Sequence, residues 1–237
     1  MDLLTQIILY AGFSGITVFI GALLANYFEH HILKRKIKYE ITHTAMAFGA
    51  GILLSALALV LIPKGLEELS LWPMLISFSS GAIVFFIIDK RLAQSGGKMA
   101  QLLAMLMDFV PESIALGALF ASDPATGTLL AVFIGLQNLP EAFNSFRDMV
   151  ISGFTVKKTL IMMFFLSFAG IVGAMIGHFF LSGSPDITAH LMVFASGGIL
   201  YLLFQDIAPE SSMKHHRWGT IGACLGFMVG MIGEKVI

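Results

Sequence analysis

Long apolar segments constrain this chain more than any other feature of its sequence. A segment of about 20 apolar residues can cross the hydrocarbon core of a lipid bilayer as an α-helix. Hydrophobic residues make up 57% of the 237 residues and charged residues only 12%, which is typical of a polytopic membrane protein. We predict one all-α transmembrane domain over residues 1–237, with eight transmembrane helices at residues 3–28, 41–63, 71–89, 99–121, 126–149, 158–181, 187–209 and 216–236.

The basic residues predict how the chain lies in the bilayer. Twelve of the 14 Lys and Arg residues follow the first, third, fifth and seventh predicted helices. Cytoplasmic loops carry an excess of Lys and Arg, so we expect a multi-pass plasma-membrane protein with both termini outside the cytoplasm. A net charge of −1 provides no basic field for nucleic acid, and the single cysteine, Cys224, allows no disulfide within the chain.

Two segments place polar side chains in the middle of apolar helices. Each has an oxygen ligand four residues before a glutamate: Asp108 before Glu112, and Gln137 before Glu141. Residues i and i+4 share one face of a helix, so each pair presents its oxygens together. A charged side chain at the bilayer centre costs about 3 kcal/mol on insertion scales, so these carboxylates need a cation or a proton.

A proline precedes the glutamate in both segments. Pro111 and Pro140 each remove a helical hydrogen bond and free a carbonyl group four residues earlier, on Met107 and Leu136. Interrupted helices near the midplane form the binding sites of many secondary transporters, so we interpret the segments as a cation pathway. The alternative is a pair of kinked helices whose acids are protonated or paired inside the protein.

A weaker internal repeat relates the second and seventh predicted helices. Five residues recur at identical spacing: Phe48, Gly51, Leu54, Leu57 and Pro63 in the second helix, and Phe194, Gly197, Leu200, Leu203 and Pro209 in the seventh. The two helices cross the membrane in opposite directions in the predicted topology, so this repeat would be inverted, as in many secondary transporters. Chance matching among apolar residues is the alternative.

The seventh predicted helix ends in a third segment of the same kind, with Asp206 and Glu210 on either side of Ala208 and Pro209. One interpretation is a way-station through which a cation leaves for the cytoplasm. The simpler interpretation is that both acids are interfacial residues at a helix end.

The fifth-helix segment resembles a motif of the ZIP (Zrt/Irt-like) family of divalent metal transporters. That motif reads His or Gln, then Asn, Asp or Glu, then any residue, Pro and Glu. The residues Gln137, Asn138, Pro140 and Glu141 match it. The resemblance covers most of the chain and implies an inverted repeat of three helices around a central pair, a 3+2+3 arrangement. Homodimers are usual in this family.

The fourth-helix segment resembles the family motif His-Asn-x-Pro-Glu less closely. Pro111 and Glu112 match, but Asp108 replaces the usual His and Phe109 the usual Asn. The chain therefore resembles a divergent prokaryotic member. Some bacterial members bind a second metal through this Asn and a sixth-helix Glu. Because Phe109 and Gly170 stand at those positions, the resemblance implies that the second site is lost.

The resemblance implies one principal metal site, formed by Asp108, Glu112, Gln137 and Glu141, with Asn138 as a weaker candidate. Carboxylate and carbonyl oxygens suit manganese, whereas imidazole suits zinc, so the loss of His should weaken a preference for zinc. Zinc still binds carboxylates, and we expect zinc, manganese or iron as the substrate. No organic cofactor is expected.

The leading hypothesis is a secondary transporter that takes a divalent transition metal into the cytoplasm by alternating access at a midplane site. The sequence contains no G-x-x-x-x-G-K-[ST] loop, which disfavours an ATP-driven pump. One alternative is a relative that binds metal as a sensor or scaffold without transporting it. An intramembrane metal-dependent hydrolase is less favoured, because neither H-E-x-x-H nor G-x-S-x-G occurs. We therefore expect no enzymatic activity.

Overall fold

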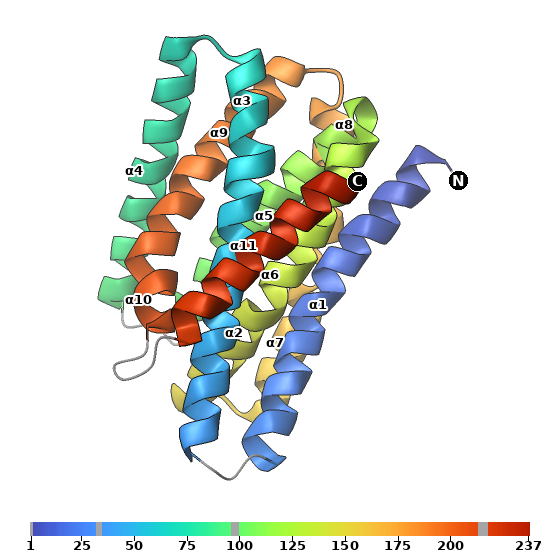
Figure 1. Ribbon diagram of the computed structural model, residues 1–237. Coiled ribbons are helices and arrows are strands. Elements are labelled where there is room, and N and C mark those ends of the chain that lie inside the picture. Colours follow the sequence, from blue (N-terminus) through green and yellow to red (C-terminus); the bar gives the residue numbers. More distant parts are fainter. Residues whose placement is uncertain (1, 32–34, 96–99, 213–217) are drawn as a thin grey trace.

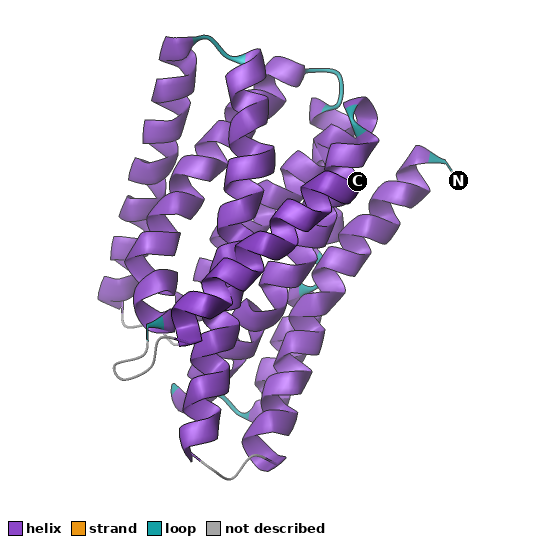
Figure 2. Ribbon diagram, viewed as in Figure 1, coloured by secondary structure: helices purple, strands orange, loops and turns teal. Residues whose placement is uncertain are grey.

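The computed structural model describes residues 2–31, 35–95, 100–212 and 218–237. Within these ranges every regular element is helical (Figure 2). The helices form an elongated bundle, and the N- and C-termini lie at the same end of it (Figure 1). We call this the upper end, and the opposite end, which holds residues 31 and 36, the lower end.

Eleven α-helices and two π-helical segments make up the described part of the chain. The long helices are α1 (Leu3–His31), α2 (Arg35–Ala56), α4 (Leu71–Ser95), α5 (Ala100–Ser122), α6 (Pro124–Ile151), α9 (Pro185–Leu202) and α11 (Trp218–Val236). The shorter elements are η1 (Leu57–Leu61), α3 (Ile62–Glu68), α7 (Val156–Leu166), α8 (Ala169–Leu181), η2 (Leu203–Ile207) and α10 (Ala208–Ser211).

Seven helical stretches of the described residues are long and apolar enough to cross a membrane: Leu3–His31, Lys36–Glu68, Leu71–Gln94, Leu102–Ser122, Val156–Leu181, Pro185–Ile207 and Trp218–Val236. The predicted span at residues 126–149 falls in α6, which has 28 residues but is not among the seven. Polar residues such as Gln137, Asn138 and Glu141 lower the hydropathy of α6. Because α1, α2 and α5 pack around it, these residues are sheltered by protein.

The helices pack in two groups. In the first group, α5 packs along α6 and α8, α1 packs along α6, and α7 contacts α1. In the second group, α2 packs along α11, α4 packs along α9, and α3 contacts α9. The two groups meet where α2 contacts α6 and where α5 contacts α9. The central pair α5 and α6 therefore belongs to the first group and borders the second.

Glycines permit close helix contacts in the second group. A Cβ atom on Gly51 of α2 would overlap the carbonyl oxygen of Ala223 on α11. A Cβ atom on Gly197 of α9 would overlap the carbonyl oxygen of Phe78 on α4. Gly51 and Gly197 are a matched pair of the predicted repeat, so equivalent glycines bring α2 and α9 against their respective partners.

The same two helices change to π-helical winding at matched positions. The first segment, η1, begins at Leu57, and η2 begins at Leu203, which is the matching residue of the predicted repeat. A proline lies shortly after each segment, Pro63 in α3 and Pro209 in α10. Because π-helical turns are rare, α2 and α9 share an uncommon feature at the same position.

The prolines of the paired motifs lie in continuous helices. Pro111 is inside α5 and Pro140 is inside α6, so the expected interruption of these two helices is not seen. The sixth predicted helix is interrupted instead, between α7 and α8. Gly49 of α2 accommodates the Pro140 ring, because a Cβ atom at Gly49 would lie 2.7 Å from the ring Cγ.

A capped N-terminus sets where α6 begins. The Asp123 carboxylate accepts a hydrogen bond from the Thr126 backbone N–H at 3.1 Å, and Pro124 is the first helical residue. The Thr126 hydroxyl donates a second hydrogen bond to Asp123 at 2.6 Å, and this bond lowers the pKa of Asp123 below its usual value. The register of α6 then carries Gln137 and Glu141 into the centre of the bundle.

The glycine contact between α2 and α11 leads to a stability prediction. Replacing Gly51 by alanine should lower the free energy of unfolding by about 1–3 kcal/mol, because the added methyl group forces two backbones apart. The measurement is the thermal unfolding midpoint of the purified protein in detergent. Gly183→Ala is the matched control, since a Cβ atom there meets nothing within 4 Å. Equal midpoints for the two variants would contradict the predicted overlap.

Candidate metal site

A cavity of about 260 Å³ lies between the two helix groups. From the first group it is lined by Asp108 of α5 and by Gln137 and Glu141 of α6. The facing wall comes from α2, α4, α9 and η2, with Met46, Gly49, Ala50, Leu53, Asp89, Leu92, Ala93, Leu202, Asp206 and Ile207. Three of the four predicted principal ligands therefore face one space, which is large enough for an ion with several water molecules.

Asp108 and Glu141 meet across the contact between α5 and α6. Asp108 is only 2% exposed, and its Oδ1 accepts a hydrogen bond from the backbone N–H of Phe109 at 2.8 Å. The carboxyl groups of Asp108 and Glu141 lie within hydrogen-bonding contact of each other. Two acidic groups from different helices are thus brought together at the wall of the cavity.

Glu112 and Gln137 form a second contact between the same helices. Glu112 is fully buried, and its Oε2 accepts a hydrogen bond from the Gln137 side-chain amide at 2.6 Å. Glu112 is not itself among the residues that line the cavity, so it lies behind Gln137 as seen from the cavity. The amide therefore connects the buried carboxylate to the cavity wall.

Several buried oxygens around this contact have no hydrogen-bond partner. They are Oε1 of Glu112, Oε1 of Gln137 and Oδ1 of Asn138. Burying an oxygen acceptor without a partner is unfavourable, and a bound cation is one way to satisfy it. As the side chains stand, no three His, Cys, Asp or Glu residues within the described ranges converge closely enough to hold a metal ion. A metal bound here would therefore need side chains to rotate towards it.

Asn138 points away from the cavity. Its side-chain amide donates a hydrogen bond to the backbone carbonyl of Ser14 on α1 at 3.2 Å. Both residues are fully buried, and neither lines the cavity. The structure therefore separates Asn138 from the other predicted ligands and gives it a contact that joins α6 to α1.

Asp206 of η2 lines the same cavity as Asp108. Asp89 near the end of α4 lines it as well, and the Tyr201 hydroxyl of α9 donates a hydrogen bond to Asp89 at 2.8 Å. The backbone of Glu210 lies in α10, but its side chain is outside the described part of the structure. The cavity thus continues from the central carboxylates to acidic residues near the lower end.

Two lining residues, Asp89 and Asn144, were not singled out from the sequence. Asp89 directly precedes Lys90 and Arg91 at the end of an apolar segment, where an acidic residue is ordinary. Asn144 follows Glu141 by three residues, so a search of the same helical face beyond the motif would have found it. Both residues line the cavity beside the predicted ligands.

An aromatic side chain fills the region beside Asp108. Phe109 is fully buried, and a Cβ atom on Gly170 of α8 would lie 2.7 Å from its Cζ. A Cβ atom on Gly15 of α1 would lie 3.8 Å from the same ring atom. The two glycines leave the space that this ring occupies, so Phe109 packs closely against α8 and α1.

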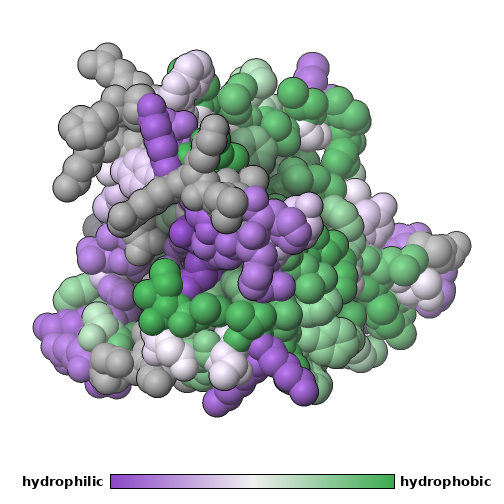
Figure 3. All heavy atoms as spheres, turned by 90° about the horizontal axis from the view of Figure 1, so that it is seen from below, coloured by the Kyte–Doolittle hydropathy of each residue, from purple (hydrophilic) through white to green (hydrophobic). Residues whose placement is uncertain are grey.

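The lower face of the molecule has a polar middle. Figure 3 looks at this end and shows hydrophilic side chains gathered near the centre of the face, with hydrophobic atoms beside them. Three cavity residues lie towards this end: Asp89, Asn144 and Asp206. Asn144 follows Glu141 in α6, whereas Asp89 lies near the lower end of α4 and Asp206 lies in η2, after the end of α9. An ion in the cavity would meet polar groups in this direction.

Comparisons with known proteins identify relatives of this chain. The sequence profile described as ZIP Zinc transporter matches residues 91–233. Zinc transporter GufA of Myxococcus xanthus is 31% identical over 136 residues, which cover 55% of this chain and 52% of GufA. Zinc transporter ZIP13 of Gallus gallus is 26% identical over 145 residues, covering 60% of this chain and 39% of the relative.

A longer match extends over nearly all of the chain. Zinc transporter ZIP13 of Pongo abelii is 23% identical over 224 residues, which cover 90% of this chain and 62% of that protein. The matched parts thus span between about two fifths and three fifths of the length of these three relatives.

The contact between Phe109 and Gly170 can be tested by a double-mutant cycle. Gly170→Ala should lower the free energy of unfolding by about 1–3 kcal/mol, because its methyl group meets a fully buried ring. In a Phe109→Leu background the same substitution should have a smaller effect, since the ring is gone. Thermal unfolding of the four proteins measures the coupling. Strictly additive effects would show that the two residues do not share this space.

Proposed function

Because the chain belongs to the ZIP zinc transporter family, we propose that it moves a divalent transition metal into the cytoplasm as a secondary transporter. The observation that carries the proposal is the cavity between the two helix groups, lined by Asp108, Gln137 and Glu141. The names of the relatives support metal as the substrate, and zinc, manganese and iron are the proposed ions. The family consists of transporters, so no enzymatic activity is proposed.

The proposed ligands are Asp108, Glu112, Gln137 and Glu141. The unpartnered oxygens of Glu112 and Gln137 support this set, because a cation would satisfy acceptors that the protein leaves without hydrogen bonds. When a metal enters, the Gln137 amide would turn its oxygen towards the ion and release Glu112 from the hydrogen bond that they share. Asn138 is a weaker candidate, since its amide is engaged with Ser14.

The proposed topology places the lower end in the cytoplasm and both termini outside. In the sequence, four basic residues at positions 34, 35, 36 and 38 follow the first helix, and α1 ends and α2 begins at the lower end, in agreement with the positive-inside rule. The cavity, with Asp89 and Asp206, would then lead from the central site towards the cytoplasm. Counting α6 as a span sheltered by its neighbours gives eight transmembrane helices, and the plasma membrane is the proposed location.

An inverted 3+2+3 repeat is part of this proposal. The matched π-helical segments and the matched glycines Gly51 and Gly197 support it. The packing partners support it too, because α2 packs on α11 as α9 packs on α4, and α1 packs on α6 as α8 packs on α5. Each of these pairs becomes the other when the first three predicted helices exchange with the last three and the central helices α5 and α6 exchange with each other.

The acidic residues near the lower end form the proposed exit path. Asp206 faces the cavity together with Asp89, whose orientation is fixed by the Tyr201 hydroxyl. Carboxylates at this place would attract a cation released from the central site. Glu210 follows Asp206 by one turn and is a weaker member of the path. A homodimer is proposed from the family resemblance.

Removal of the buried carboxylates tests transport. In liposomes containing purified protein, Glu112→Ala and Glu141→Ala should each lower uptake of zinc, manganese or iron at least about tenfold, equivalent to about 1.4 kcal/mol of stabilisation of the bound ion. Glu67→Ala is the control, because that side chain is 67% exposed, does not line the cavity and belongs to α3 at the upper end of the bundle. Metal that binds to the wild-type protein but never accumulates in the liposomes would identify a binding relative without transport.

Exchange of Asp108 for histidine tests what sets the choice of metal. Asp108→His adds an imidazole ligand, which suits zinc better than manganese. We expect the ratio of zinc uptake to manganese uptake to rise about tenfold in competition assays. Asp108→Asn separates the loss of the charge from the gain of the imidazole. An unchanged ratio in both variants would remove Asp108 from the ligand set.

A further inference from the structure

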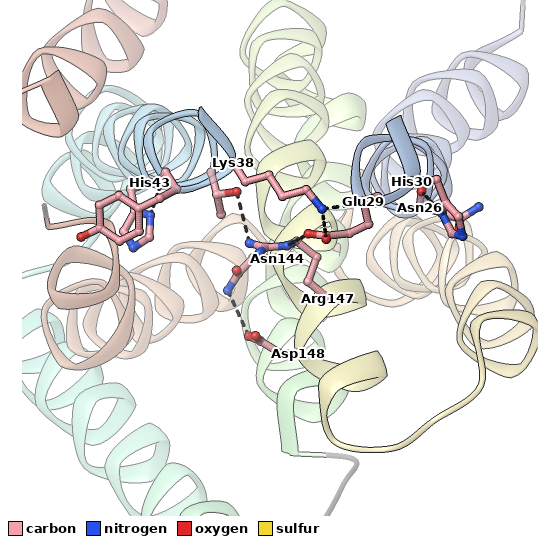
Figure 4. Close-up of polar contacts among 10 residues, drawn as sticks. Asn26, Glu29, His30, Lys38, His43, Asn144, Arg147 and Asp148 are labelled. Carbon is pink, nitrogen blue, oxygen red and sulfur yellow. Dashed lines mark hydrogen bonds and ion pairs between the residues drawn. The ribbon is translucent and has the colours of Figure 1, made fainter. Parts of the chain in front are cut away.

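A network of charged side chains joins three helices at the lower end of the bundle. Glu29 of α1 lies between two cationic groups, as Figure 4 shows. Its Oε1 accepts a hydrogen bond from Nε of Arg147 on α6 at 2.6 Å, and its Oε2 accepts one from Nζ of Lys38 on α2 at 2.6 Å. Lys38 also donates to the backbone carbonyl of Glu29 at 2.9 Å. Both oxygens of this carboxylate are therefore engaged.

A further bond ties Arg147 to α2. Its Nη1 donates to the hydroxyl oxygen of Thr42 at 3.1 Å. Thr42 is 2% exposed, whereas the side chains of Lys38, Arg147 and Glu29 are 21%, 23% and 34% exposed. The network is thus partly sheltered from solvent, and it ends in a buried hydroxyl.

The network crosses the boundary between the two helix groups. Glu29 and Arg147 belong to the first group, and Lys38 and Thr42 belong to the second. The same two helices form walls of the metal cavity, through Met46 on α2 about one turn after Thr42, and through Asn144 on α6 about one turn before Arg147. These contacts therefore hold α2 against α6 where the cavity approaches the lower end.

We propose that Glu29, Lys38, Thr42 and Arg147 form a clamp that holds the two helix groups together at the lower end and so restricts access to the cavity from that end. The inference rests on the proposed function, because alternating access requires the two helix groups to move relative to each other. A movement of α2 away from α1 and α6 separates Lys38 from Glu29 and Thr42 from Arg147. The clamp releases in that movement, which widens the lower end of the cavity, and it forms again when the two groups come back together.

Glu29 is the residue on which the clamp depends. Without its carboxylate, Lys38 and Arg147 face each other with no acid between them, and like charges at short range repel. Glu29→Gln removes this charge at nearly constant shape. Thr42→Val removes only the hydroxyl group that accepts from Arg147 and leaves the ion pairs in place. The two variants weaken the same cross-group contact by different chemical changes.

Access to the cavity can be measured by cysteine labelling. The exposed Cys224 is first replaced by serine, and Ala104→Cys then places a thiol on the cavity wall, outside both the clamp and the proposed ligand set. The rate of reaction with a water-soluble maleimide is measured on purified protein in detergent. Glu29→Gln and Thr42→Val should each speed labelling about two- to fivefold, as expected when a partly exposed polar contact is lost from the less accessible of two states.

The Lys36→Met variant is the matched control. It removes an ion pair between Lys36 and Glu40 at 3.8 Å, which lies within α2 and does not cross between the groups. Its labelling rate should equal that of the parent. Labelling at the parent's rate in Glu29→Gln, in Thr42→Val and in their combination overturns the clamp, as does slower labelling in these variants.

The labelling assay tests the clamp and the uptake assay tests the proposed function, so one proposal can fail while the other stands. The maleimide reaction reports access to the cavity and needs no metal, whereas liposome uptake reports movement of the ion. Faster labelling in the clamp variants supports the clamp even in a protein that accumulates no metal. Unchanged labelling in a protein that does accumulate metal overturns the clamp and leaves the proposed function standing.

Discussion

The hydrogen bond from Gln137 to Glu112 joins the two central helices inside the apolar bundle. Glu112 is fully buried and Gln137 is 2% exposed. Among the described side chains, only Gln137 donates a hydrogen bond to Glu112. A buried carboxylate is unfavourable by several kcal/mol unless partners replace its water. The amide provides one partner, and the second oxygen of Glu112 is left for another. The centre of the fold is therefore polar, sheltered and incomplete without a cation or a proton.

This buried centre determines how the surrounding helices are arranged. Polar residues of α6 cannot face lipid without loss of their partners, so α1, α2 and α5 enclose this helix. The proposed ligands all come from the first group, whereas the facing wall of the cavity belongs to the second. A relative movement of the two groups can therefore change access to the cavity while the helices that carry the ligands stay together.

The central motif could be predicted from the sequence because Asp108, Glu112 and Glu141 interrupt apolar segments in which charge is rare. The helical class follows from the same segments. Asp89 could not be predicted as a cavity residue, because it looks like an ordinary interfacial acid until α4 packs on α9. The orientation of Asn138 towards Ser14 was also hidden, since a motif gives the order of residues but not the neighbour that each one meets.

The two ends of α2 are held by different forces. At the lower end, partly exposed ionic and hydroxyl contacts hold the helix, and water can replace such contacts with a small change in free energy. At the upper end, η1 packs Leu57, Val60 and Leu61 inside the core, each at most 2% exposed. Separating such closely packed side chains gives up many van der Waals contacts at once, so the upper end resists separation more strongly. Because of this asymmetry, we expect the first movement of α2 to be a release at the clamp, with η1 as the fixed end.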